Sequence, residues 1–202
     1  MPSEKKRPVK IAVTGPPAAG KSTILALLQD LGVPTFSADA VVKELSKPCR
    51  EGYHLFCQRF GRGFLTASGE LDRRLILETM LVDPQFKKTL EEIFHPLVKK
   101  ELFRWFQREK GQEVLAAEIP LLYQAGWADF FDQVIWVDCP EELLLARLEK
   151  RLGRKDLARK LLEQYQAGLP PKRKALELAG YLPRERLAEK ITAILNQLKR
   201  QK

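Results

Sequence analysis

Cysteine and histidine are scarce in this chain of 202 residues, which contains three cysteines and two histidines. Cys49, Cys57 and Cys139 show no C-x-x-C spacing and have no paired histidines beside them. The sequence therefore predicts neither a disulfide framework nor a zinc site, because both need clustered sets of such residues. We expect all three cysteines to be reduced thiols.

Long hydrophobic runs are absent as well. No stretch reaches the roughly 20 apolar residues of a membrane-spanning helix, and the charged residues 1–8 are not followed by the apolar segment of a secretory signal. Internal repeats and low-complexity segments are also missing from the sequence. We expect a cytoplasmic protein without a membrane partner, present as a monomer or a weak homo-oligomer.

Basic residues outnumber acidic ones, with 35 Lys and Arg against 26 Asp and Glu and a formal net charge of +9. Such an excess fits a nucleic-acid-binding protein or an enzyme whose substrates carry several phosphates. The basic clusters lack the interleaved aromatics that a nucleic-acid surface often has, so we expect small-molecule substrates and no nucleic acid. The alternative is that each of these basic residues simply lies on a solvent-exposed face of a helix. The clustered residues are Arg147, Lys150, Arg151, Arg154, Lys155, Arg159, Lys160, Lys172, Arg173 and Lys174.

Residues 15–22 read GPPAAGKS and follow the apolar run VKIAV at 9–13. This is the complete pattern G-x-x-x-x-G-K-[ST] in a strand-then-helix setting, which is typical of a phosphate-binding loop. Backbone N–H groups and the helix dipole bind the phosphates, Lys21 reaches the β- and γ-phosphates, and Ser22 can ligate magnesium. The alternative is an ordinary Gly/Pro turn before a helix. The residues predicted to bind the nucleotide are Gly15, Pro17, Ala18, Ala19, Gly20, Lys21, Ser22 and Thr23.

Apolar, partly β-branched runs at 9–14, 113–119 and 134–137, with a short run at 35–37, predict the parallel strands of an α/β protein. The length and the hydrophobic content of 45% fit one domain with an inserted helical lobe. The short strand at 35–37 ends at Ala38-Asp39, and ligand sites in doubly wound sheets lie at the carboxyl ends of strands. We therefore expect Asp39 near the phosphate loop; its alternative role is the N-cap of the next helix.

The remaining segments have helical spacing. Residues 52–110 read as helical, with Asp72 as an N-cap. From 141 onward the pattern is helical again, and Gly153 interrupts it within a basic stretch, as the hinge of a phosphate-covering lid would.

Several strings together resemble dephospho-coenzyme A kinase in order and spacing, from about 9 to 174. They are DLGVP at 30–34 with AD at 38–39, GELDR at 69–73, HP at 95–96, IPLL at 119–122 and the basic run 147–151. The resemblance implies a P-loop NTPase-type doubly wound parallel sheet, with a core at about 9–45 and 112–202, a helical substrate lobe at 46–111 and a helical lid at 147–165. It also implies transfer of the γ-phosphoryl group of ATP to the 3′-hydroxyl of dephospho-coenzyme A, with Mg²⁺.

The resemblance also suggests roles for single residues. Lys21, Arg147 and Arg151 would stabilise the transferring phosphoryl group, and Asp39 matches the family's base beside the accepting hydroxyl. Glu118, where the family usually has aspartate, would hold a magnesium-bound water together with Ser22. On the acceptor side the matching residues are Arg73, His95 and Leu121. For His95 and Pro96 the alternative is a helix cap followed by a first-turn proline.

Departures from the family pattern keep two other readings open. Residues 16–19 differ from the usual loop, Ser37 replaces an aspartate, Gln124 replaces a glutamate and Lys160 replaces an arginine. The string after the lid is shortened to ALELAG at 175–180, with Leu178 in place of asparagine. We expect from this that a fifth edge strand and an adenine contact are missing. The first alternative is a kinase for another acceptor, such as a nucleotide or a vitamin-like alcohol. The second is a degenerate relative that binds nucleotide without turnover.

Overall fold

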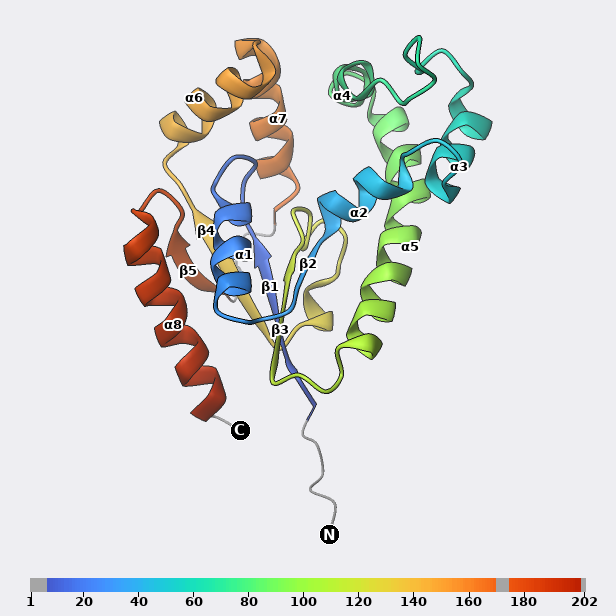
Figure 1. Cartoon of the computed structure of the whole chain (residues 1–202). Coiled ribbons are helices and arrows are strands. Elements are labelled where there is room, and N and C mark those ends of the chain that lie inside the picture. Colours follow the sequence, from blue (N-terminus) through green and yellow to red (C-terminus); the bar gives the residue numbers. More distant parts are fainter. Residues whose placement is uncertain (1–6, 170–174, 201–202) are drawn as a thin grey trace. The chain divides into compact units, whose positions relative to one another are not determined.

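The computed structural model describes residues 7–169 and 175–200 and divides into two compact units (Figure 1). The sheet unit comprises Met1–Ser37 and Trp105–Lys202, and the helical unit comprises Ala38–Arg104. The helical unit begins and ends a few residues before the predicted limits of the substrate lobe, which were 46 and 111. The basic residues Lys172, Arg173 and Lys174 lie outside the described residues.

Five parallel strands form the sheet, in the order β2-β3-β1-β4-β5. The predicted α/β class with a parallel sheet is therefore confirmed. All five carboxyl ends meet at one edge, where the register pairs Glu118 with Val13 on one side and with Ser37 on the other. The strands are β1 (Val9–Thr14), β2 (Thr35–Ser37), β3 (Val114–Glu118), β4 (Gln133–Asp138) and β5 (Leu176–Ala179).

The expected loss of the fifth strand is wrong, because β5 pairs with β4 from Ile135 opposite Leu176 to Asp138 opposite Ala179. A strand at the edge of a sheet pairs through backbone N–H and C=O groups alone, so the shortened segment 175–180 can still form one. Leu178, which stands where the family has asparagine, is 3% exposed and joins the hydrophobic core. The substitution therefore strengthens the packing of this strand.

Four helices complete the sheet unit. α1 packs beside α8, and buried residues such as Ile24, Leu28, Ile191 and Leu195 join the core that also contains Ile11 and Val13. α6 ends at Gly153, whose φ of 69° lies in the left-handed region that glycine adopts at no steric cost. The predicted interruption at Gly153 is therefore confirmed. The helices are α1 (Lys21–Asp30), α6 (Glu141–Leu152), α7 (Lys155–Ala167) and α8 (Arg184–Arg200), with a short 3₁₀ turn η1 (Ala128–Phe130).

The helical unit is built around phenylalanine side chains. Phe56 is fully buried, and its ring lies 4.8 Å from Phe60 and 6.4 Å from Phe86 between centroids. The helices are α2 (Ala38–Leu45), α3 (Glu51–Phe60), α4 (Arg73–Met80) and α5 (Pro84–Arg108), the last of which ends in the sheet unit. The prediction of helix over residues 52–110 is wrong for 61–72, which are not helical and include an isolated bridge between Leu65 and Leu71.

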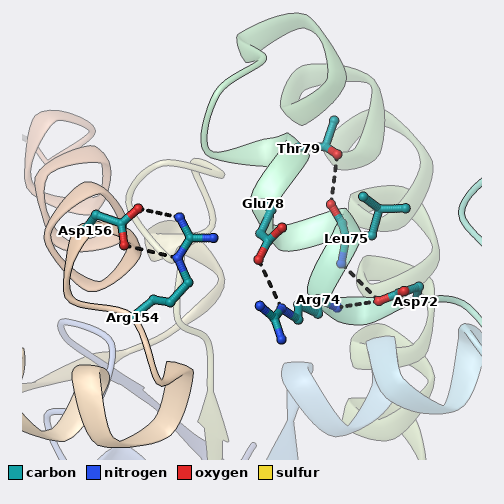
Figure 2. Close-up of polar contacts among 7 residues, drawn as sticks. All are labelled: Asp72, Arg74, Leu75, Glu78, Thr79, Arg154 and Asp156. Atoms are coloured by element: carbon teal, nitrogen blue, oxygen red, sulfur yellow. Dashed lines mark hydrogen bonds and ion pairs between the residues drawn. The ribbon is translucent and has the colours of Figure 1, made fainter.

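Asp72 is the N-cap of α4, as predicted (Figure 2). Its Oδ1 accepts hydrogen bonds from the N–H groups of Arg74 at 3.1 Å and Leu75 at 3.0 Å. Arg74 and Glu78 then form an i,i+4 ion pair along the same helix. The turn of α4 that carries Arg73 is thus fixed by local contacts.

The capping alternative for His95 and Pro96 is wrong, because both lie in the interior of α5. The true cap is Asp83, whose Oδ1 accepts from the N–H groups of Gln85 at 2.9 Å and Phe86 at 3.0 Å, with Pro84 in the first helical position. Pro96 has no N–H to donate within the helix. His95 is therefore a helix-interior residue.

The three cysteines form no disulfide in the structure. Cys49, Cys57 and Cys139 are free thiols, and burial raises the pKa of the Cys139 thiol. Within residues 7–169 and 175–200, no group of three or more His, Cys, Asp or Glu side chains is arranged to hold a metal ion. No helix in this part of the chain combines the length and apolarity needed to span a membrane.

Candidate active site

The phosphate loop connects β1 to α1 at the carboxyl edge of the sheet. Gly15 has a φ of 146°, and a Cβ there would lie 2.4 Å from the Val137 carbonyl oxygen, so this position accepts only glycine. Gly20, the N-cap of α1, has a φ of 104°. Ala18 has a φ of 65°, an uncommon conformation for a residue other than glycine. The loop thus adopts a strained, specific conformation ahead of the helix.

Lys21 is buried, with 7% of its surface exposed. Its Nζ donates hydrogen bonds to the carbonyl oxygens of Gly15 at 3.0 Å and Pro16 at 2.8 Å. A buried ammonium needs such partners, because an unsatisfied charge in the interior is costly. The contacts hold the positive charge inside the curve of the loop.

Glu118 is the second buried charged residue at this edge, with 4% of its surface exposed. Its Oε1 accepts a hydrogen bond from the Ser22 hydroxyl at 3.3 Å, and its Oε2 accepts one from the Ser37 hydroxyl at 3.4 Å. The three side chains come from the ends of β3 and β2 and from the first turn of α1. One carboxylate and two hydroxyls therefore converge beside the phosphate loop.

Ser37 is the site residue that sequence reasoning missed, since it was noted only as a departure from the family pattern. The usable signal was its place as the last residue of β2, two residues before Asp39. Parallel strands bring their carboxyl ends together, and the register sets Ser37 opposite Glu118.

Arg147, the first arginine of the predicted lid, contacts the loop directly. The Arg147 Nη1 donates to the Ala18 carbonyl oxygen at 3.0 Å and lies 3.7 Å from the Cys139 Sγ. Arg151 lies one turn later on α6 and is exposed. The structure thus brings Arg147 together with the loop, whereas Arg151 faces solvent.

Arg154 is paired with a carboxylate at the start of α7 (Figure 2). Its Nε lies 3.1 Å from Asp156 Oδ1, and its Nη2 lies 2.6 Å from Oδ2. The hydrogen bonds from Arg154 lower the pKa of Asp156, and the charge attraction acts in the same direction. Part of the positive charge in this basic stretch is therefore neutralised locally.

Three predicted residues belong to the helical unit. Asp39 is exposed and is the second residue of α2, so the N-cap alternative is wrong; a carboxylate in the first turn still favours the helix dipole. Arg73 is exposed at the first position of α4. His95 is partly buried, and burial lowers its pKa while the charge of Glu91 opposes this shift.

Leu121 lies in the sheet unit, three residues after Glu118, and is partly buried. Gln124, in the same segment, donates from Nε2 to the Tyr165 carbonyl oxygen of α7 at 3.3 Å. Gln124, which stands where the family has glutamate, therefore connects this segment to α7.

Comparisons with known proteins show which proteins this chain is similar to. A family model described as dephospho-CoA kinase matches residues 9–176. A dephospho-CoA kinase of Bdellovibrio bacteriovorus is 37% identical over 143 residues, which cover 70% of this chain and 71% of that protein. One of Symbiobacterium thermophilum is 36% identical over 147 residues, 71% of this chain, but the match spans only 61% of that protein's length.

A crystal structure of a Thermus thermophilus protein superimposes with a TM-score of 0.72 at 29% identity, covering 96% of this chain and 99% of that one. The fold is thus shared over nearly the whole length of both chains. The family model covers far more than half of the sequence, and the phosphate loop, strands β1 to β4 and the buried Glu118 lie within the matched residues. This chain belongs to the dephospho-CoA kinase family.

Proposed function

We propose that this chain transfers the γ-phosphoryl group of ATP to the 3′-hydroxyl of dephospho-coenzyme A, giving coenzyme A and ADP. The observation that carries the proposal is the convergence of Lys21, Ser22 and Glu118 at the carboxyl edge of the sheet, in a member of this kinase family. Phosphoryl transfer depends on positioning and charge neutralisation more than on covalent chemistry of the protein.

The phosphates of ATP bind the amino end of α1 and the backbone of the loop. Pro16 and Pro17 have no N–H, so the donors come from Ala18 onward. Lys21 exchanges the carbonyl oxygens of Gly15 and Pro16 for β- and γ-phosphate oxygens, because charged acceptors form stronger hydrogen bonds than neutral ones. The buried ammonium is thus held within reach of its target before ATP binds.

The oxygen donors beside Ser22 fit a magnesium ion, which takes hard oxygen ligands and keeps several waters. The Ser22 hydroxyl would ligate it directly and Glu118 through water, while Ser37 fixes the Glu118 carboxylate by its hydrogen bond. When bound, Mg²⁺ would neutralise negative charge on the phosphates of ATP. One buried carboxylate from the protein is sufficient here, because the phosphates of ATP supply the rest of the negative charge around the ion.

Asp39 acts on the acceptor. Its exposed carboxylate orients the 3′-hydroxyl and takes the hydroxyl proton as the oxygen bonds to the γ-phosphorus and the bond to the β,γ-bridging oxygen breaks. Arg73, His95 and Leu121 bind the rest of dephospho-coenzyme A, with Arg73 on its diphosphate.

Arg147 and Arg151 lie four residues apart and so share one face of α6. Arg147 already contacts the loop at Ala18. In the closed lid, both guanidinium groups clamp the transferring phosphate with the planar pair of donors that lysine lacks.

An acceptor panel tests the proposal. ADP formation is measured with ATP and dephospho-coenzyme A, with AMP, or with pantothenate as a vitamin-like alcohol. We expect kcat/KM for dephospho-coenzyme A to exceed the others by about a hundredfold or more, since a site built for one hydroxyl acceptor rejects poorly bonded ones. Faster turnover of another acceptor would identify a different kinase, and ATP binding without any turnover would identify a degenerate relative.

Asp39→Asn separates the acceptor side from the ATP side. We expect kcat to fall about a hundredfold or more, because the proton acceptor is lost, with ATP affinity unchanged within about twofold. The matched control is Asp129→Asn, an exposed carboxylate in η1, which should retain full activity. Wild-type kcat in Asp39→Asn would remove Asp39 from the mechanism.

A further inference from the structure

Gly180 and the phosphate loop meet so closely that neither side has room for a side chain. Gly180 directly follows β5, far from the loop in sequence. A Cβ at Gly180 would lie 2.0 Å from the Ala19 carbonyl oxygen, and a Cβ at Gly20 would lie 2.8 Å from the Gly180 carbonyl oxygen. Both neighbouring atoms are backbone, so no rotamer change can relieve either contact.

The position of Gly180 is itself fixed by the sheet. Its N–H donates to the Asp138 carbonyl oxygen at the end of β4, at 2.7 Å, and a Cβ would also meet the Val137 Cγ1 at 2.5 Å. Gly180 is not among the residues with positive φ, so its backbone conformation is open to any residue. The need for glycine here is therefore a matter of space and not of backbone strain.

We propose that Gly180 is a positioning residue for ATP binding, because the turn after β5 sets the location of Ala19 and Gly20 and so the direction of the loop N–H groups. This inference rests on the proposed function only in that the loop binds ATP. Real Cβ atoms essentially never come within 3.0 Å of such an atom, so a methyl group at Gly180 must move the loop and the turn after β5 apart by about 1 Å.

Gly180→Ala tests the proposal through direct ATP binding, measured by titration calorimetry without acceptor, and through steady-state kinetics. A displacement of about 1 Å can cost about a hundredfold. We expect about that loss in kcat/KM for ATP, a dissociation constant for ATP at least about tenfold higher, and an unchanged KM for dephospho-coenzyme A. The matched control is Gly111→Ala, where a Cβ meets nothing within 4 Å. Wild-type ATP affinity in Gly180→Ala would overturn the proposal.

A second pair of variants distinguishes displacement of the loop from disturbance of the core. Val137→Ala removes the Cγ1 that a Cβ at Gly180 would meet but leaves the Ala19 carbonyl in place. In the Val137→Ala background, Gly180→Ala should still weaken ATP binding about tenfold. Recovery of ATP affinity in the double variant would show that the effect arises from packing against Val137, and the proposal would be wrong.

Amide hydrogen exchange in the unmodified protein gives a test that does not depend on the folding of any variant. Saturating ATP should slow exchange at the loop amides 18–20 and at residues 180–182 together, but not at 111–113. Protection of the loop with none at 180–182 would overturn this inference while leaving the proposed function intact. Protection at neither place would contradict ATP binding and thus the proposed function as well.

Discussion

The two units bury different kinds of side chain. Among the described residues, the buried polar side chains of the sheet unit are Thr14, Lys21 and Glu118, and that of the helical unit is Thr89. Two of the three in the sheet unit are charged and lie at the carboxyl edge of the strands. Charged groups are expensive to bury, so their place in the sheet unit reflects the phosphate chemistry of that edge and not stability.

The helical unit gains its stability from aromatic packing. Phe56, Phe60, Phe64 and Phe86 form a cluster whose ring centroids lie 4.3 to 6.4 Å apart. The comparison therefore separates two kinds of variant: those in the phenylalanine cluster should change stability, and those at the carboxyl edge should change activity.

The largest effect is expected for Phe56→Ala, since Phe56 is fully buried. Truncation of a buried phenylalanine removes its transfer energy and leaves a cavity, which together cost about 3–5 kcal/mol. Urea unfolding followed by circular dichroism measures the loss. Leu55→Ala, at a neighbouring exposed position, is the control and should cost less than about 1 kcal/mol. Equal losses in both variants would show that the cluster does not dominate the stability of this unit.

Lys21→Ala is expected to have the opposite effect to Phe56→Ala: a large loss of activity with little change in stability. Loss of the contact to the transferring phosphate should lower kcat about a hundredfold or more, or about 2.7 kcal/mol in activation free energy. The free energy of unfolding should stay within about 1 kcal/mol, because removal of the ammonium also removes the cost of burying its charge, which offsets the loss of its hydrogen bonds to the loop carbonyls. Steady-state kinetics measure the loss of kcat, and urea unfolding measures the change in stability. The control is Lys190→Ala at an exposed position. Wild-type kcat at saturating ATP would contradict the role of the loop.

The sequence predicts well those features that depend on neighbouring residues. The phosphate loop, the Asp72 cap and the apolar strands β1, β3 and β4 are all local patterns, and the structure has each of them. The wrong alternative of a helix cap at His95 arose because the Asp83–Pro84 pair, which is also local, was not recognised as the helix start.

Features that depend on distant residues escaped prediction. β5 forms through backbone pairing with β4, which its side-chain pattern barely records. The burial of Lys21 follows from the curvature of the loop, and the convergence of Ser37 on Glu118 follows from strand register. The acceptor-side roles of Asp39, Arg73 and His95 stay predictions from family resemblance.

His95 gives the smallest expected effect, a pH dependence of stability. Burial lowers its pKa from the ordinary value of 6.5, so the unfolded chain binds the proton more readily than the folded one. Stability should therefore be constant above about pH 6.5 and fall as the pH drops below it, by at most about 1.4 kcal/mol per pH unit, until the lowered pKa is passed. His95→Gln should remove this contribution, whereas His54→Gln, at an exposed position, should keep it. Unfolding free energies from pH 5 to 8 measure the difference. A wild-type protein that gains stability relative to His95→Gln on acidification would show that the imidazolium finds a partner in the fold, and burial would then not be the dominant influence on this histidine.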